Sequence, residues 1–449
     1  MRLSNIMYIL LMALGIPAMD SCKKFLDAKP DKSLAVPSGL TDYQAILDWY
    51  ARVNFRGATV PNFCSDDYYM DDKDFASLTE VKQNKYLWKR KNIFTEGYDD
   101  WAEIYTTIYY ANTALNNVPA ITRNASNAAA WDNAMGQALF IRANAFFQAA
   151  LVWTQAYDES TAGKDLGIPL RETTDFNVIS TRSTLQQTYD KIISDLKKSI
   201  PLLPLHAVHP MRPEKSSAYA LLARVYLYMR QYPLAYLYAD SCLKLKNDLM
   251  DYNQIDPGPK YPIPAYNIED IYEQQTYSFS KHAKVDSTLY PLFEDNDLRK
   301  TLFFSDNGDG SHFFRGSYEQ NLAPFIGLAT DEIYLIRAEC EARLGKTSQA
   351  MDDLNTLLIT RWKTGTFIPY TASSQQDALS QILTERRKEL MMRQARWMDV
   401  KRLNKEGYNI PMIRYTLGKT YTLAPNSTGY VLPIPEKVIQ LTGMPQNPD

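Results

Sequence analysis

The stretch SSAYALLARVYLYMRQYPLAYLYADSCLKL, from Ser216 to Leu245, decides the fold of this chain of 449 residues. Small and apolar residues recur along it at helical spacing: Tyr219, Leu222, Ala223, Tyr226, Ala235 and Cys242. These are the spacings of a tetratricopeptide helix pair, in which small residues let two helices approach closely. The stretch therefore predicts one unit of a helical repeat.

A second unit follows in Asp331–Leu358, where Ala338 and Ala350 have the same spacing as two alanines of the first unit, and Gly345 marks the turn. Stacked repeats need about three neighbours to bury their faces, so further, degenerate copies are expected. Met135–Tyr157, rich in alanine and aromatic residues, has the pattern of the first helix of one. The fold class predicted is mainly α, a tetratricopeptide-like helical repeat scaffold with long irregular loop insertions.

The rest of the chain alternates between helical and irregular segments. Helical periodicity begins at Thr41, a suitable N-cap, and returns over Asp99–Val118 and Ser183–Leu203. Three segments lack helical periodicity. We expect a surface loop at Arg52–Lys91, a functional loop insertion at Lys246–Leu328 and an extended tail at Tyr421–Asp449. We expect a single domain over 41–449, with repeat helices near 99–245 and 331–404 and the insertion at 246–328.

The first residues predict export. Arg2 precedes an apolar stretch, Ile6 to Met19, that has the length of a signal-peptide core, whereas a membrane span needs about 20 apolar residues. Cys22 follows closely, as in the lipobox of bacterial lipoproteins, in which signal peptidase cuts before a cysteine whose thiol carries diacylglycerol. We therefore expect a signal peptide at 1–21, a lipid anchor on Cys22 and a tether over 22–40. The alternative is an ordinary secretory signal in which Cys22 is incidental.

Composition argues against several function classes. The net charge of −2 does not indicate a polyanionic partner, and the basic segment at 384–406 has no second basic patch beside it. We therefore expect no nucleic-acid binding. Cys64, Cys242 and Cys340 are widely spaced and form neither a disulfide framework nor a zinc pattern. The chain has 31 tyrosines, whose flat apolar rings with polar edges suit sugar stacking as well as helix packing.

No arrangement typical of catalysis or metal binding emerges from the sequence. Three acidic groups could supply paired carboxylates, yet they lie in expected loops, where acidic residues are ordinary: Asp66 with Asp67, Asp71 with Asp72, and Glu294 with Asp295 and Asp297. The segment Asp306–Gly310 departs from the EF-hand pattern and predicts a tight turn. His206 and His209 lack a third ligand nearby in the sequence. We expect no enzyme activity, no cofactor and no metal.

The segments LTERRKEL, Leu383 to Leu390, and RWMDVKRL, Arg396 to Leu403, resemble the helix shared by SusD-like (RagB-type) outer-membrane lipoproteins of Bacteroidetes. Other segments agree with this family in order along nearly the whole chain, among them Leu166–Leu170 and Leu432–Pro435. By its own residues, the shared helix should be solvated and salt-bridged, with Glu389 and Arg393 paired at i, i+4. That pattern favours a structural role over a catalytic one.

The resemblance implies a SusD-like α-α superhelix, anchored by its lipid in the outer membrane and exposed at the cell surface. It also implies capture of an oligosaccharide ligand and its transfer to a partner TonB-dependent outer-membrane transporter of the SusC-like kind. It does not specify the glycan, because the loops that bind ligand vary in sequence between members.

Two stretches combine aromatic rings with polar side chains that suit sugar hydroxyls, namely Asp66–Phe75 with Tyr86 and Trp88, and Tyr277–Tyr318. The candidate ligand-binding residues are Tyr68, Tyr69, Trp88, Tyr277, His312, Phe314, Arg315 and Tyr318. Two alternatives stay open. One is a peptide-binding protein of the same fold, and the other is a tetratricopeptide interaction scaffold without a small ligand, which burial of the candidate rings would favour.

Overall fold

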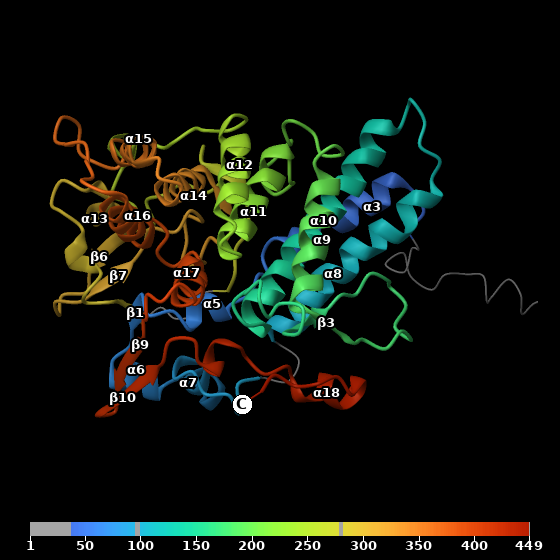
Figure 1. Cartoon of the computed structure of the whole chain (residues 1–449), viewed down its shortest axis with the longest axis horizontal. Helices are drawn as coiled ribbons and strands as arrows, with labels where there is room; N and C mark the ends of the chain where they lie inside the picture. The colour runs from blue at the N-terminus through green and yellow to red at the C-terminus, as the bar shows by residue number, and fades with distance from the viewer. Residues whose placement is uncertain (1–36, 95–98, 278–281, 449) are drawn as a thin grey trace, which may run out of the picture.

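The computed structural model describes residues 37–94, 99–277 and 282–448 (Figure 1). The proposed signal peptide, Cys22 and most of the tether lie outside the described residues. Within the described residues, none of the helices combines the length and the apolar character that a membrane crossing requires.

Seven helices form the predicted repeat frame: α8 (Asp100–Asn117), α9 (Ala128–Trp153), α10 (Leu185–Ser199), α11 (Lys215–Tyr228), α12 (Tyr232–Leu243), α14 (Thr330–Arg343) and α15 (Thr347–Leu358). Successive helices pack as pairs, and α12 packs against α14 across the insertion (Figure 1). Ala223, Ala235, Ala338 and Ala350 are all fully buried. The small residues therefore sit where the helices approach each other, and the mainly α repeat architecture is confirmed.

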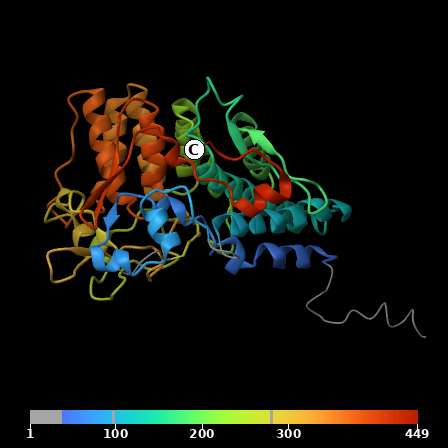
Figure 2. The same ribbon diagram turned by 90° about the horizontal axis from the view of Figure 1, so that it is seen from below.

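The long helix α9 lies at the centre of one half of this frame. It packs against α8 on one side and α10 on the other, and α3 (Leu40–Leu47) lies alongside α8 and α9 (Figure 2). Its alanine-rich sequence suits this position, because a helix covered by neighbours on several sides needs small apolar residues all round. The N-cap of α3 is Gly39 and not the predicted Thr41, which lies within the first turn.

The segment with the family resemblance is not one helix but two, α16 (Gln375–Glu389) and α17 (Ala395–Asn404). The chain reverses between them through Met392 and Gln394, whose φ angles are 61° and 66°. Gln394 is fixed there because its backbone N–H donates to Asn62 Oδ1 at 2.7 Å. The continuous helix that the sequence predicts is thus wrong at residues 390–394.

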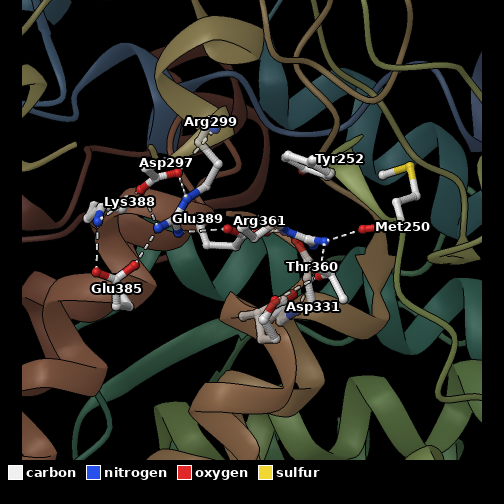
Figure 3. A network of polar contacts seen from close by, with 12 residues as sticks. Met250, Tyr252, Asp297, Arg299, Asp331, Thr360, Arg361, Glu385, Lys388 and Glu389 are labelled. Atoms are coloured by element: carbon white, nitrogen blue, oxygen red, sulfur yellow. Dashed lines mark hydrogen bonds and ion pairs between the residues drawn. The ribbon is translucent and has the colours of Figure 1, made fainter. Parts of the chain in front are cut away.

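Four charged residues of α16, Glu385, Arg386, Lys388 and Glu389, are buried and not solvated. Figure 3 shows three of them, Glu385, Lys388 and Glu389. Glu389 accepts from Arg299 at 2.9 Å and from Arg361 at 2.7 Å, and all three side chains are fully buried. The predicted pair between Glu389 and Arg393 does not form, because Arg393 is paired with Asp331 of α14. The helix is held by ion pairs to other elements, which explains its high charge within a core.

Arg52–Lys91 is not the surface loop that the sequence predicts. It contains the end of α4 (Tyr50–Val53) and all of α5 (Val60–Phe63), β1 (Tyr68–Tyr69), α6 (Asp72–Ala76) and α7 (Glu80–Tyr86). The buried guanidinium of Arg414 explains its order, since it lies 3.6 Å from the centre of the Tyr86 ring and donates to the carbonyls of Phe63 and Ser65. Cation–π contacts and hydrogen bonds from one distant residue thus hold the segment in place.

The insertion at 246–328 forms several short elements: β4 (Asp270–Tyr272), β5 (Lys284–Val285), α13 (Leu298–Phe303), β6 (Phe304–Asp306), β7 (His312–Phe314) and β8 (Leu328–Ala329). Strands from the insertion join β1 in an antiparallel sheet with the order β1-β5-β7-β6. This sheet brings together the two stretches of candidate ligand-binding residues. The predicted turn at Asp306–Gly310 connects β6 to β7.

The C-terminal segment is partly regular and tightly held, unlike the extended surface tail that its prolines predict. It contains β10 (Lys419–Leu423), the 3-10 helix Thr428–Tyr430 and α18 (Glu436–Thr442), and β9 (Met412–Thr416) precedes it. Elsewhere in the chain, the remaining elements are β2 (Leu166–Pro169), β3 (Arg182–Thr184) and the short 3-10 helices Val118–Ala120, Tyr252–Gln254 and Tyr290–Leu292. Arg90 donates to the carbonyls of Val431 and Pro448, and Asn447 is buried. These bonds fasten the tail to the body.

Candidate functional site: a groove between β1 and the β9–β10 hairpin

A groove with a volume of about 950 Å³ lies where β1, the start of α6 and strand β9 meet. Its lining residues combine aromatic rings, carboxylates, hydroxyls and cationic side chains: Asp66, Tyr68, Tyr69, Met70, Asp71, Asp72, Lys73, Asp286, Ser287, Thr288, Arg387, Pro411, Ile413, Arg414 and Tyr415. The walls come from parts of the chain that are far apart in sequence. The tertiary structure alone therefore creates this site.

The register of the sheet places Tyr69 and Tyr68 on opposite faces. Tyr69 is paired with Lys284, which is paired in turn with Phe313, so these three residues share one face. Tyr68 is only 2% exposed, and its hydroxyl donates to the carbonyl of Phe63 at 2.6 Å. Because successive side chains of a strand alternate, Tyr69 is the ring that β1 offers to a ligand.

Strand β9 supplies the second ring, Tyr415, which is 71% exposed. Ile413 is also exposed, whereas Met412, Arg414 and Thr416 are buried. Sequence reasoning missed Tyr415, and the alternation in Ile413–Thr416 would place the apolar Ile413 and Tyr415 on the buried face, opposite to the face that the structure buries. An exposed phenol at this position faces solvent from the rim of the groove.

The polar groups of the groove are held by ion pairs at its inner end. Arg396 binds both oxygens of Asp66, at 2.6 and 2.8 Å, and Arg387 donates to Asp67 at 3.2 Å. Burial opposes ionisation of Asp66, but the Arg396 guanidinium outweighs it and lowers the pKa of that carboxyl to about 2. Asp66 is therefore charged at neutral pH. Burial raises the pKa of Asp67, against the effect of Arg387.

The outer rim carries acceptors for a hydroxylated ligand. Asp71 caps α6 by accepting from the backbone N–H of Asp74, and this bond, with help from Lys284, lowers the pKa of Asp71. Asp71, Ser287 and Thr288 are exposed to solvent. Carboxylate and hydroxyl oxygens near two phenol rings can bind hydroxyl groups while the rings cover an apolar surface.

Three of the predicted ligand-binding residues are core residues, so the prediction that they contact ligand is not supported by their positions. Trp88 is 9% exposed, and its indole N–H donates to the carbonyl of Cys64 at 2.9 Å. Tyr318 is 2% exposed and donates to Glu269 at 2.6 Å. Tyr68 is buried as described above. In each case a buried aromatic residue satisfies its polar edge inside the protein, which anchors a loop.

The other four candidates do not line the groove. His312 stacks on Tyr290 with ring centres 3.5 Å apart, and Phe314 packs against Phe303 at 5.8 Å. Arg315 donates to the backbone carbonyls of Pro257, Pro259 and Thr301, which stabilise the insertion. Tyr277 is 46% exposed on another part of the surface. Of the predicted residues, the groove thus brings together only Tyr68, which is buried, and Tyr69, which is half-buried.

The acidic groups considered for catalysis have structural partners. Asp297 is fully buried in ion pairs with Arg299 and Lys388, and Asp295 binds Lys300 at the surface. Among the described residues, no cluster of three histidine, cysteine or acidic side chains has a geometry that could hold a metal ion. Cys64, Cys242 and Cys340 are free and buried, as small apolar residues would be.

Comparison with known proteins identifies the relatives of this chain. Residues 24–227 match a family model described as "Starch-binding associating with outer membrane" (SusD-like_3), and residues 317–449 match the SusD_RagB model, described as "SusD family". SusD-like protein P38 of Formosa agariphila is 23% identical over 483 aligned positions, covering 89% of this chain and 91% of that protein.

Solved structures share the fold. A putative sugar binding protein from Bacteroides vulgatus aligns with a TM-score of 0.73 and 21% identity, covering 92% of this chain and 99% of that one. A SusD superfamily protein from Bacteroides fragilis aligns with a TM-score of 0.73 and 20% identity, covering 91% and 99%. These structures, each under 25% identical, show the shared fold. The two family models match the two ends of the chain, and SusD-like protein P38 is similar along most of it, so the chain belongs to the SusD/RagB family.

Proposed function

We propose that this protein is an outer-membrane lipoprotein that binds an oligosaccharide in the groove between β1 and β9 and passes it to a partner TonB-dependent transporter. Its lipid anchor would be Cys22, and its ligand-binding face would be exposed at the cell surface. No bond of the ligand is made or broken in this function.

The observation that carries the proposal is the combination of two accessible phenol rings, Tyr69 and Tyr415, with oxygen acceptors and the Arg387 guanidinium in one groove. A sugar presents apolar C–H faces and many hydroxyls, so it needs both kinds of partner at once. The family and the described binding of its relatives support a glycan as the ligand. The volume of about 950 Å³ suits more than one sugar residue.

Isothermal titration calorimetry against a panel of neutral oligosaccharides and a matched panel of peptides tests the proposal. The protein is the full chain with Cys22→Ser, kept in detergent. We expect at least one oligosaccharide to bind, and Tyr415→Ala to weaken that binding about fivefold to tenfold, which corresponds to about 1 kcal/mol for one stacking ring.

Tyr236→Ala is the matched control, because Tyr236 is a half-buried tyrosine on α12, outside the groove. Binding of peptides alone would favour the peptide-binding alternative. Failure of every oligosaccharide and peptide to bind would leave the scaffold hypothesis as the better account.

A further inference from the structure

A strip of two exposed rings and four half-buried side chains lies beside α8, apart from the groove. We call it the α8 strip, and it consists of Tyr277, Arg56, Glu103, Arg52, Trp49 and Tyr110. It shares no residue with the lining of the groove. In Figure 1 and Figure 2, α8 lies well apart from α6, which carries the groove's rim.

Direct contacts connect each member of the strip to the next. The guanidinium of Arg56 lies 4.5 Å from the centre of the Tyr277 ring, and that of Arg52 lies 5.8 Å from the centre of the Trp49 ring. Glu103 binds both guanidiniums, Arg52 at 3.1 Å and Arg56 at 3.3 Å. The carboxylate thereby fixes two cations, each of which holds an aromatic ring.

The side chains of the strip are held in place by α8 and by ring packing. Glu103 and Tyr110 are two helical turns apart on α8, so they point to the same side. The Tyr110 ring packs against Trp49 with centres 5.3 Å apart. Trp49 nevertheless keeps 49% of its surface exposed and Tyr277 keeps 46%. The rings are therefore positioned in advance, and binding would cost little side-chain entropy.

The chemistry of the strip suits a glycan. Three charged side chains occupy its middle, where a hydroxylated ligand can both donate and accept hydrogen bonds, and the test below separates a glycan from a protein partner, whose interfaces are also rich in Trp, Tyr and Arg. Guanidinium N–H groups donate to hydroxyl oxygens and a carboxylate accepts from hydroxyl groups, while the indole and phenol faces cover the apolar side of a sugar ring. An extended hydroxylated chain uses all of these groups.

We infer that the α8 strip is a second glycan-binding surface, which holds a polysaccharide chain while the groove binds a shorter part of it. This inference rests on the proposed function, because it assumes that the ligand is a glycan. Two surfaces on one protein raise the affinity for a long chain through effective concentration, without any new contact to a short oligosaccharide. The strip should therefore matter for polymers only.

The test compares a polysaccharide with a short oligosaccharide derived from it, both chosen from the glycan that binds in calorimetry. The full chain with Cys22→Ser is used in detergent, and polymer affinity is measured by affinity electrophoresis. Trp49→Ala should weaken polymer binding about fivefold to tenfold and leave the short oligosaccharide within about twofold. Trp49→Phe, which keeps a ring, should restore most of the affinity, and Tyr236→Ala should change neither.

Three results would overturn the inference. Unchanged polymer affinity in both Trp49→Ala and Tyr277→Ala would assign the strip to another partner, such as a protein. An equal loss for polymer and short oligosaccharide would mean that the strip is not a separate surface. If the wild type binds no glycan, the proposed function fails as well, and that outcome is distinct from the first two because it precedes any variant.

Discussion

The buried carboxylate of Glu389 should be one of the most important single groups for stability. It accepts charge-assisted hydrogen bonds from Arg299 at 2.9 Å and Arg361 at 2.7 Å, and none of the three side chains is exposed (Figure 3). In Glu389→Gln, the amide keeps the shape but loses the charge that faces two guanidiniums. Removing one partner of a buried ion pair costs about 3 to 5 kcal/mol, because the other charge is left uncompensated.

Part of this loss should be compensated by the neighbouring Glu269. Burial raises the pKa of Glu269 to about 7, against the effect of Arg361 and with a contribution from the Glu389 charge. Without Glu389, Glu269 ionises more readily and balances Arg361, which it already binds at 2.7 Å. We therefore expect the free energy of unfolding to fall by about 3 kcal/mol, at the lower end of the range for buried pairs.

Urea denaturation monitored by tryptophan fluorescence measures this change, with Asp132→Asn as the control. Asp132 binds Arg123 at 2.7 Å, but the Arg123 side chain is 50% exposed, so its loss should cost less than about 1 kcal/mol. The reasoning about the buried network would be refuted if Glu389→Gln cost no more than Asp132→Asn.

Three further predictions follow from particular positions. An added Cβ at Gly327 would lie 2.1 Å from a backbone carbonyl oxygen of β4, whereas one at Gly163 meets nothing within 4 Å. In urea denaturation, the free energy of unfolding should therefore fall by about 1 to 3 kcal/mol in Gly327→Ala and almost not at all in Gly163→Ala. Burial lowers the pKa of the Lys401 amine from 10.5 to about 7, so the unfolded chain binds more protons between these values. The stability of the wild type relative to Lys401→Met should therefore rise with pH from 7 to 10.5, and a flat or falling difference between urea titrations across that window would contradict this. Trp88→Ala should lose about 3 to 5 kcal/mol of stability, while Tyr415→Ala should change stability by less than about 0.5 kcal/mol and affect only glycan binding, as thermal denaturation and calorimetry on the same samples would show.

Several features of the frame could be predicted from the sequence because they depend on local periodicity. Helix α8 was expected over Asp99–Val118 and spans Asp100–Asn117. The paired alanines of the two repeat units predict close helix contacts, and they are fully buried. Residue spacing along one helix determines which face is apolar, so no knowledge of distant contacts is needed.

The order of 52–91 could not be predicted in this way. Its short helices have little periodicity of their own, and they are held by Arg414, which lies more than three hundred residues later in the chain. The break between α16 and α17 likewise depends on Asn62, which binds the backbone at Gln394. A single distant hydrogen bond or cation–π contact can order a segment whose local sequence indicates a loop.

Residue spacing and short local segments are sufficient to predict the helical repeat and the family of this protein. Which aromatic rings are available to a ligand depends on contacts between segments that are far apart in the chain. Tyr68 and Tyr69 are neighbours in sequence and both border the groove, yet Tyr68 is buried and Tyr69 is only half-buried, because a strand turns alternate side chains to opposite faces. Tyr415, which is far from Tyr69 in sequence, lines the same groove. Their proximity depends on packing between distant elements, which a local sequence pattern does not predict.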